Sequence, residues 1–390
     1  MRNIMICGAS GSMASYLLES LTKVNNVESD LRVFMVGRDL EKLVKSANIL
    51  TIASSLVGNG HQFIPLLIDI EQDPIALTAA ISEINPEIVV NATRAVSGVK
   101  YGPMSIKMGV GYGVWLPFSM RLSYLIAKAV EASGTHAMLI NSSYSDAVCP
   151  ALAEMADART PTIGIGNVFH LVPRIQMAVA SLVNSHFKME KKHSDFEVFL
   201  TSGHFSNTYI SREGDARGSE TLLEVYSTEG GIPQETLSFY GFSKEDVYAK
   251  CKDIKVAEGS QRNIMAASST FRCIMELLQP SGRLFHAPGV HGLVGGYPVY
   301  AEENSLTGDV ILNIHSPSYT LNQMIKCNEQ NLRCDGIDSI KEGKVTWTAD
   351  AIESMAIHLG FCHKSMNLDF DTIVAYGDEL KAKLIENGMM

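Results

Sequence analysis

Two histidines in this chain have side chains suited to moving a proton during hydride transfer to a carbonyl. His204 stands in Gly203-His204-Phe205, directly after an apolar run at 196–200 that predicts a strand. Imidazole titrates near neutral pH, as a proton donor to a carbonyl oxygen should, so His204 is the first candidate. His170 is the second, either as a partner of His204 or as the donor itself. For both residues the alternative is a surface histidine or a core histidine with structural hydrogen bonds.

Two arginines are candidates for binding the carboxylate of a small substrate. Arg174 lies one helical turn past His170, on a helix expected near 171–185, and Arg94 follows a strand expected at 87–91. The planar fork of a guanidinium suits the two oxygens of a carboxylate better than a lysine does. We therefore predict that Arg174 or Arg94 binds the substrate; the alternative for either is a structural ion pair.

A glycine-rich turn near the amino end predicts a dinucleotide site. Residues 8–14 read Gly-Ala-Ser-Gly-Ser-Met-Ala and follow an apolar strand expected at 3–7. Glycine permits a sharp turn and the close approach of a diphosphate, and a small residue lets the next helix pack on the sheet. Main-chain N–H groups and the positive end of a helix expected at 12–23 would hold the diphosphate. The predicted cofactor contacts here are Gly8, Ser10, Gly11, Ser12 and Met13. An ordinary strand-to-helix turn is the alternative.

The end of the second expected strand indicates which dinucleotide binds. The strand at 31–36 is followed by Gly37-Arg38-Asp39. Sites for NAD usually place a carboxylate there, which accepts hydrogen bonds from the ribose. A guanidinium pairs instead with a 2′-phosphate, so Arg38 favours NADP. NAD is the alternative, with Arg38 as a solvated charge and Asp39 reaching the ribose.

The order of the expected elements predicts the fold. Strands and helices alternate up to about residue 165, as a parallel sheet with helices on both faces requires, and a mixed pattern follows. We predict an α/β protein with an N-terminal Rossmann doubly wound parallel sheet at 1–166 and a C-terminal α+β domain at 167–390. The first would bind NADP or NAD, and the second would bind substrate and carry catalysis. Strand ends in such a sheet face the cofactor, which adds Asn91, Thr93, Asn141 and Ser143 to its predicted contacts.

Composition indicates an intracellular enzyme. The 390 residues carry a net charge of −10, whereas proteins that bind nucleic acids have concentrated basic surface. No apolar stretch reaches the roughly 18 residues of a membrane span, and the amino end lacks the pattern of an export signal. The seven cysteines have no close pairing, which fits a reducing compartment. We expect a cytoplasmic protein whose partner is a small molecule, with no nucleic acid and no membrane.

The segment 97–115 contains five glycines and no regular pattern. Loops of this length are usually functional or disordered, and glycine lets them hinge. The hypothesis is that this loop closes over bound substrate; a passive surface loop is the alternative.

Several short motifs, taken in order, resemble the superfamily of lactate and malate dehydrogenases, which also contains the NAD-using family 4 glycoside hydrolases. The similar segments are 8–11, 89–98, 139–146, 164–174, 203–205 and 292–299. The resemblance implies a Rossmann domain followed by an α+β domain, and a homodimer. It also implies hydride transfer to or from a small carboxylated 2-oxo or 2-hydroxy compound, or an imine, with His204 as the proton-transferring histidine.

The chain also departs from these families. Ser143-Tyr144 stands where they have an Asn-Pro pair, and no aspartate precedes Arg174 by one turn to orient the histidine. Gly166 stands where a family 4 glycosidase needs a metal-binding cysteine, so no metal is expected. Two alternatives remain open: a glycosidase-like enzyme that uses the nucleotide transiently, and a non-catalytic dinucleotide-binding sensor.

Overall fold

The first half of the chain is built around one parallel sheet. The computed structural model describes residues 1–25, 29–96, 104–105, 108–227, 235–257 and 259–389. All six strands of this sheet are parallel and lie in the order β3-β2-β1-β4-β5-β6. They are β1 (Arg2–Cys7), β2 (Leu31–Gly37), β3 (Gln62–Leu67), β4 (Ile88–Asn91), β5 (Met138–Asn141) and β6 (Ile163–Gly164). This order confirms the predicted doubly wound Rossmann sheet.

The central strand β1 shows why the sheet is covered on both faces. Successive side chains of a strand point to opposite faces. Ile4 and Ile6 pack into one apolar cluster with helices α1 (Ser12–Leu21) and α2 (Leu40–Leu56). Met5 and Cys7 pack into another with helices α3 (Pro74–Ile84) and α5 (Leu116–Ala132). An unbroken apolar run is what a strand buried on both faces requires.

Strand β6 consists of only two residues. Only Ile163 and Gly164 pair with β5. Pro161, two residues before β6, has no N–H to donate to the sheet. At Gly164 any side chain would collide with Ser145, so this end of β6 lies close against the start of α6 (Ser145–Ala153). The chain therefore leaves the sheet early and enters α7 (Asn167–Phe187).

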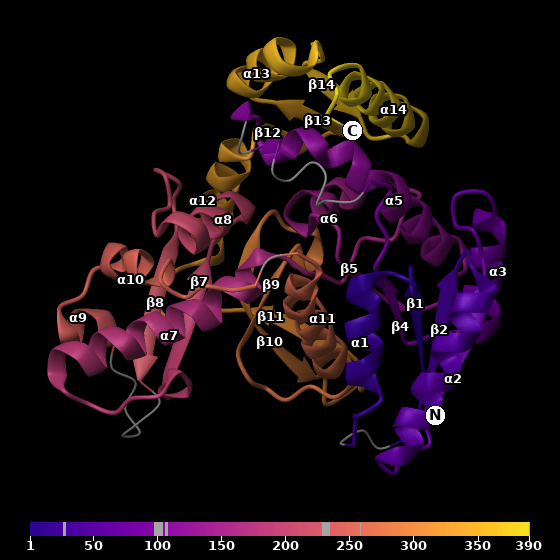
Figure 1. Cartoon of the computed structure of the whole chain (residues 1–390), viewed down its shortest axis with the longest axis horizontal. Coiled ribbons are helices and arrows are strands. Elements are labelled where there is room, and N and C mark those ends of the chain that lie inside the picture. Colours follow the sequence, from indigo (N-terminus) through magenta and orange to yellow (C-terminus); the bar gives the residue numbers. More distant parts are fainter. Residues whose placement is uncertain (26–28, 97–103, 106–107, 228–234, 258, 390) are drawn as a thin grey trace.

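The second half is α+β, as predicted. An antiparallel pair, β7 (Phe196–Thr201) and β8 (Leu222–Ser227), packs beside α7, and the sheet β11-β10-β9 lies in the middle of the molecule (Figure 1). The remaining helices and strands are α8 (His204–Glu213), α9 (Thr236–Tyr240), α10 (Lys244–Cys251), α11 (Asn263–Leu278), β9 (Phe285–Pro288), β10 (Gly296–Glu303), β11 (Val310–Ile314), α12 (Leu321–Cys334), β12 (Ile337–Lys341), β13 (Lys344–Trp347), α13 (Ala349–Leu359), β14 (Ser365–Asn367) and α14 (Phe370–Glu386).

The C-terminal segment, from β12 onward, packs against helices of the first half of the chain. The sheet β12-β13-β14 with α13 and α14, yellow in Figure 1, lies over α5 and α6. Its Val345 and Trp347 belong to the same apolar cluster as α5, and Arg121 Nη1 donates to Asp378 Oδ1 at 2.8 Å. The core thus continues from the Rossmann sheet into this C-terminal segment. The division at residue 166 stays a prediction.

Part of the glycine-rich segment 97–115 can be placed. Residues 97–103 and 106–107, on which much of the loop hypothesis rests, lie outside the described residues. The segment ends in a 3₁₀ helix, η1 (Tyr112–Trp115). Gly113 N–H donates to the carbonyl of Asp335 at 2.8 Å, and a side chain at Gly111 would collide with that same carbonyl. The end of the segment is therefore packed against the end of α12.

In the described part of the chain, no helix combines the length and the apolar character that crossing a bilayer requires. All seven cysteines are free thiols, and five of them are buried.

Candidate active site

The turn between β1 and α1 is tight and passes close to the backbone that follows β4. Gly8 has φ +86°, and an added Cβ would lie 3.0 Å from the carbonyl oxygen of Ala92. Gly11 is the N-cap of α1 and provides no side chain to cap it, and the first turn of α1 contains no acidic residue. The first N–H groups of a helix have no partner inside it, so the positive end of α1 lacks a side-chain cap here. This is the place where the sequence predicted a dinucleotide.

The predicted residues around this turn lie close together. Gly8, Ser10 and Met13 are partly exposed, while Gly11 and Ser12 are exposed. The carbonyl of Ser10 accepts a hydrogen bond from Lys42 Nζ at 3.0 Å, which ties the turn to the first turns of α2. Their contact with a cofactor stays a prediction.

Asn91 and Asn141, at the ends of β4 and β5, form a buried polar network. Each is 1 % exposed. Asn91 Nδ2 donates to Asn141 Oδ1 at 2.9 Å and to Ser123 Oγ at 2.9 Å, while Asn91 Oδ1 accepts from the N–H and hydroxyl of Thr93. These hydrogen bonds hold the C-terminal ends of β4 and β5 together, at the edge of the sheet where the predicted cofactor contacts lie.

Ser143 differs from these asparagines because its hydroxyl is unpaired. Its backbone N–H donates to Asn141 Oδ1 at 3.4 Å. Its Oγ is buried and has no hydrogen-bond partner among the described residues. A buried hydroxyl without a partner costs free energy, and a polar ligand at this edge of the sheet would relieve that cost.

His204 is the first residue of α8 and is held by a carboxylate from α12. Its Nδ1 lies 2.9 Å from Oδ2 and 3.2 Å from Oδ1 of Asp335, the residue that caps the C-terminus of α12. The side chains are 17 % and 5 % exposed. Tyr144, the N-cap residue of α6, donates its hydroxyl to the same carboxylate at 3.1 Å. The pair is therefore fixed to the exit of the Rossmann sheet.

The charges around His204 favour its protonated form. Burial by itself lowers the pKa of His204, but the charge and hydrogen bond of Asp335, with a further contribution from Asp146, raise that pKa above its usual value. The ring of Tyr112 lies 4.1 Å from the imidazole, centroid to centroid, and the ring of Tyr144 at 5.3 Å. A ring face beside an imidazolium adds a cation–π attraction.

Asp146, in the first turn of α6, is a second carboxylate beside the imidazole. It is 5 % exposed, and backbone N–H groups, including that of His204, donate to its carboxylate. Burial raises the pKa of Asp146 to about 6, with His204 acting in the opposite direction. His204 thus lies within the field of two buried aspartates.

The other predicted catalytic residues occupy different surroundings. Arg94 is exposed after β4, and its charge acts to lower the pKa of His204. Burial and then the charge of Arg262 lower the pKa of His170 to about 4, so this histidine is neutral at neutral pH. Arg174 is 7 % exposed, and its Nη1 donates to the carbonyls of Ser211 at 3.2 Å and Ile254 at 3.0 Å. The guanidinium of Arg174 therefore joins α7 to α8 and to the segment after α10, as a structural role for it would require.

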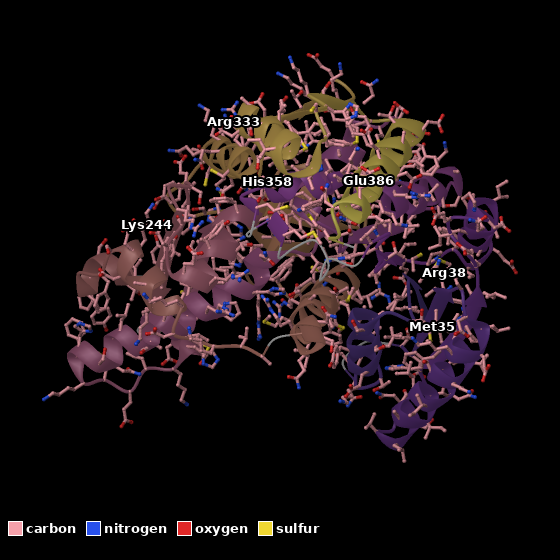
Figure 2. All side chains as sticks on the ribbon, turned by 45° about the horizontal axis from the view of Figure 1, so that its top comes forward. Met35, Arg38, Lys244, Arg333, His358 and Glu386 are labelled. Carbon is pink, nitrogen blue, oxygen red and sulfur yellow. The ribbon has the colours of Figure 1, made fainter. Side chains whose placement is uncertain are left out.

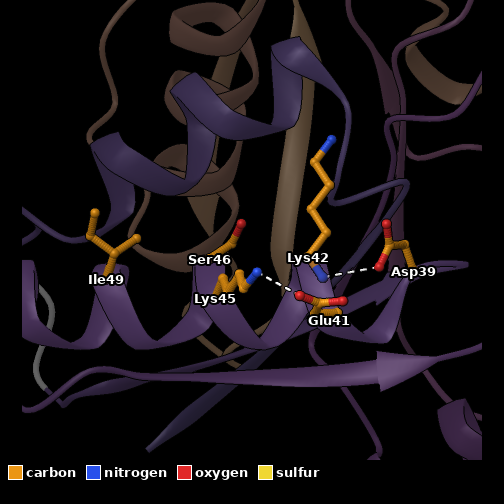
Figure 3. Close-up of a pocket in the computed structure, with 6 residues that line it drawn as sticks. All are labelled: Asp39, Glu41, Lys42, Lys45, Ser46 and Ile49. Carbon is orange, nitrogen blue, oxygen red and sulfur yellow. Dashed lines mark hydrogen bonds and ion pairs between the residues drawn. The ribbon is translucent and has the colours of Figure 1, made fainter.

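Arg38 lies at the surface of the Rossmann half (Figure 2). Beside it, a groove of about 510 Å³ runs along the first turns of α2 and is lined by Asp39, Glu41, Lys42, Lys45, Ser46 and Ile49. Asp39 Oδ1 accepts from the N–H of Lys42 at 3.0 Å as the N-cap of α2, and Glu41 pairs with Lys45 (Figure 3). The carboxylate that was the alternative ribose acceptor is thus engaged at the helix start.

The sequence did not identify Asp335 or assign a role to Asp146. Asp335 stands 131 residues from His204, between Cys334 and Gly336 at the end of a helix, where an aspartate is unremarkable. Asp146 fell within a motif of the resemblance, yet nothing local indicates that its carboxylate faces a histidine on another helix.

Position 166 has little space for the cysteine of a glycosidase. An added Cβ at Gly166 would lie 2.9 Å from Cγ of Pro288 and 3.1 Å from Oδ2 of Asp146. Within the described ranges, no group of three or more histidine, cysteine, aspartate or glutamate side chains is arranged to hold a metal ion.

Comparison with known proteins identifies solved structures of similar fold. The sequence matches no protein-family model and no curated protein. Lactate dehydrogenase of Cryptosporidium parvum, solved with lactic acid and nicotinamide adenine dinucleotide, superposes with a TM-score of 0.54 at 15% identity, covering 86% of this chain and 98% of that chain. The fold is that of the lactate and malate dehydrogenases.

Two malate dehydrogenases give the same result. That of Plasmodium falciparum has a TM-score of 0.52 at 13% identity, and that of Naegleria fowleri 0.54 at 10% identity, each covering 86% of this chain and 96% of that chain. At such identities the likeness concerns the fold, so residue roles have to be argued from this chain's own geometry. The resemblance to family 4 glycoside hydrolases stays an expectation.

Proposed function

We propose that this chain is an oxidoreductase that transfers a hydride between NADP and a small carboxylated 2-oxo or 2-hydroxy compound, or the corresponding imine. The observation that carries the proposal is the His204–Asp335 pair, at 2.9 Å, which Tyr144 links to the segment after β5 of the Rossmann sheet. A proton donor oriented by a carboxylate is what carbonyl reduction needs next to a hydride source.

The residues present fit a nicotinamide dinucleotide, which when bound supplies the hydride. Gly8 leaves main-chain space at the turn, and the uncapped start of α1 suits a diphosphate. The unpaired hydroxyl of Ser143 is available to a polar group of the nicotinamide half. Thr93 and Ser143 would hold that half, and Gly11, Ser12 and Met13 the diphosphate.

The proton step follows from how His204 is held. Because Asp335 accepts from Nδ1, Nε2 is the ring nitrogen left for the substrate. Nε2 would give its proton to the substrate oxygen in the reduction direction and would take it back in the oxidation direction, while the bound dinucleotide would supply or accept the hydride. Since the pKa of His204 is raised, the imidazolium is available up to a higher pH than an ordinary histidine allows. Arg94, whose charge acts on His204, would bind the substrate carboxylate.

NADP is preferred in this proposal because of the charges after β2. Arg38 is exposed, and Lys42 Nζ, already at the dinucleotide turn, adds a second cation. Asp39 serves as the N-cap of α2. A 2′-phosphate is a better partner for this set than a ribose hydroxyl pair.

The test is turnover of reduced nucleotide by the purified chain. NADPH and NADH are each offered with a panel of 2-oxo acids, alone and with ammonia or a primary amine to form imines, and loss of nicotinamide absorbance is followed. We expect turnover with at least one carboxylated substrate, faster with NADPH. Tight nucleotide binding with no turnover across the panel would instead indicate a sensor and contradict the proposal.

A further inference from the structure

Asp146, in the first turn of α6, is a buried carboxylate that the proposed proton step does not use. The residue is 5 % exposed. The hydrogen bonds to its carboxylate come from two backbone N–H groups, its own and that of His204. The imidazole of His204 is already hydrogen-bonded to Asp335. Because a buried carboxylate costs free energy unless a cation compensates its charge, the charge of Asp146 is available to a cationic ligand.

The surroundings of Asp146 keep one of its oxygens free of side chains from α7. An added Cβ at Gly166, the N-cap of α7, would lie 3.1 Å from Oδ2 of Asp146. Glycine at this position therefore leaves the oxygen uncovered on that side. With a pKa of about 6, the carboxylate carries its negative charge at pH 8.

A second buried polar group lies at the approach to the same helix. Ser143 precedes Asp146 by three residues, and its Oγ has no hydrogen-bond partner among the described residues. The proposed function assigns this hydroxyl to the nicotinamide half of the dinucleotide. Asp146 thus follows, within one turn of the chain, the residue that would lie beside the reacting ring.

The charges around the imidazole suit a substrate whose reacting atom is positive. Asp335 and Asp146 both raise the pKa of His204, whereas Arg94, which lowers it, is exposed. Two buried carboxylates therefore accompany one imidazolium. Reduction of a carbonyl develops negative charge on its oxygen, which the second carboxylate disfavours. The nitrogen of a protonated imine is positive instead, and a carboxylate stabilises it.

We propose that the substrate of this site is the imine of a 2-oxo acid and that Asp146 binds its nitrogen. The inference rests on the proposed function and selects one of its substrate classes. Nε2 of His204 would give its proton to the imine nitrogen, and Asp146 would accept a hydrogen bond from the N–H so formed. The carbon would take a hydride from the reduced nucleotide, which is thereby oxidised. The C=N double bond would become a single bond, the product would be an amino acid, and solvent would return a proton to Nε2.

The experiment compares oxygen and nitrogen compounds that share one carboxylate, on the full chain. Pyruvate is offered with NADPH, alone and with methylamine to form the imine. Calorimetry in the presence of NADP compares lactate with N-methylalanine. Asp146→Asn removes the charge and keeps the shape of the side chain. Glu154→Gln is the matched control at the other end of α6, where Glu154 is exposed and its Oε2 accepts from the N–H of Gly343 at 3.1 Å.

We expect wild type to reduce the imine with a higher kcat/KM than pyruvate. Asp146→Asn should lower kcat/KM for the imine about tenfold or more, as the loss of a charge-assisted hydrogen bond should. The value for pyruvate should stay within threefold or rise. N-methylalanine should bind wild type more tightly than lactate and lose this advantage in Asp146→Asn, whereas Glu154→Gln should match wild type.

Three results would overturn the inference and leave the proposed function in place. The first two need no variant: wild type reduces pyruvate as well as the imine, or it binds lactate as tightly as N-methylalanine. The third is an equal loss for both substrates in Asp146→Asn, which indicates a structural role. Absence of turnover with either substrate would count against the proposed function, and the calorimetric preference would then decide whether Asp146 binds a cationic nitrogen.

Discussion

His204 Nδ1 and Asp335 Oδ2 lie 2.9 Å apart although 131 residues separate them in the chain. The histidine begins α8 and the aspartate ends α12. A carboxylate in this position fixes the orientation and tautomer of an imidazole and stabilises its charged form. In this chain the partner of the histidine comes from the far end of a helix that leads into the C-terminal sheet.

Replacing Asp335 by asparagine is expected to lower kcat about 100-fold or more, because general acid–base catalysis contributes about 10²–10⁴ in rate and an amide does not stabilise the imidazolium. The dissociation constant of NADPH should stay within threefold. Steady-state kinetics and nucleotide fluorescence measure the two quantities. Asp338→Asn, an exposed carboxylate three residues away that pairs with Arg333, is the matched control and should leave kcat unchanged.

The free energy of unfolding should depend on pH because of the His204–Asp335 interaction. The folded pKa of His204 is raised above the ordinary value of about 6.5. The stabilisation from its charged form is therefore present in full below about pH 6.5 and is lost as pH rises through the folded pKa. Urea unfolding of wild type and Asp335→Asn from pH 6 to pH 10 measures it. The difference in free energy of unfolding should shrink as pH rises; a difference that grows would contradict the assignment.

His204→Gln should abolish turnover and leave nucleotide affinity within a few fold, since the imidazole is the proton donor of the proposed reaction. His170→Gln, at a residue that is neutral at neutral pH, should keep the kcat of wild type to within a few fold. Parallel kinetics on both variants decide between the two histidines. Activity retained in His204→Gln and lost in His170→Gln would transfer the role to His170.

Gly8→Ala should weaken nucleotide binding and destabilise the fold. Gly8 has φ +86°, and its added Cβ would press on the Ala92 carbonyl. Gly134, with φ +68° and no atom within 4 Å of an added Cβ, is the control: Gly134→Ala has the left-handed strain alone, about 1–2 kcal/mol. Chemical denaturation and NADPH titration measure both variants. We expect the larger loss of stability, and the only loss of affinity, in Gly8→Ala.

Arg38→Ala should raise the dissociation constant of NADPH about tenfold or more, as the loss of a charge-assisted contact predicts, and leave that of NADH within twofold. Lys45→Ala is the control from the same groove, because Lys45 already pairs with Glu41. Titration of wild type and of each variant with NADPH and with NADH measures these dissociation constants. Equal affinities of wild type for the two nucleotides would exclude the preference for NADP.

Local patterns of the sequence were enough to predict the Rossmann half. The unbroken apolar run of β1 and the glycines at 8 and 11 are neighbours in the chain, and their backbone demands are set by the residues themselves. The sheet order confirmed that prediction. Histidine at the start of α8 could likewise be singled out, because it follows a strand and a glycine.

Tertiary structure alone decided how these residues are partnered. Asp335 reaches His204 because α8 and α12 pack together, and no periodicity in either helix encodes that contact. The same packing directs the guanidinium of Arg174 to two backbone carbonyls. The sequence by itself thus determined the local backbone and the kinds of chemistry available. The partners of each charged side chain depend on distances between segments far apart in the chain, which only the packed core sets.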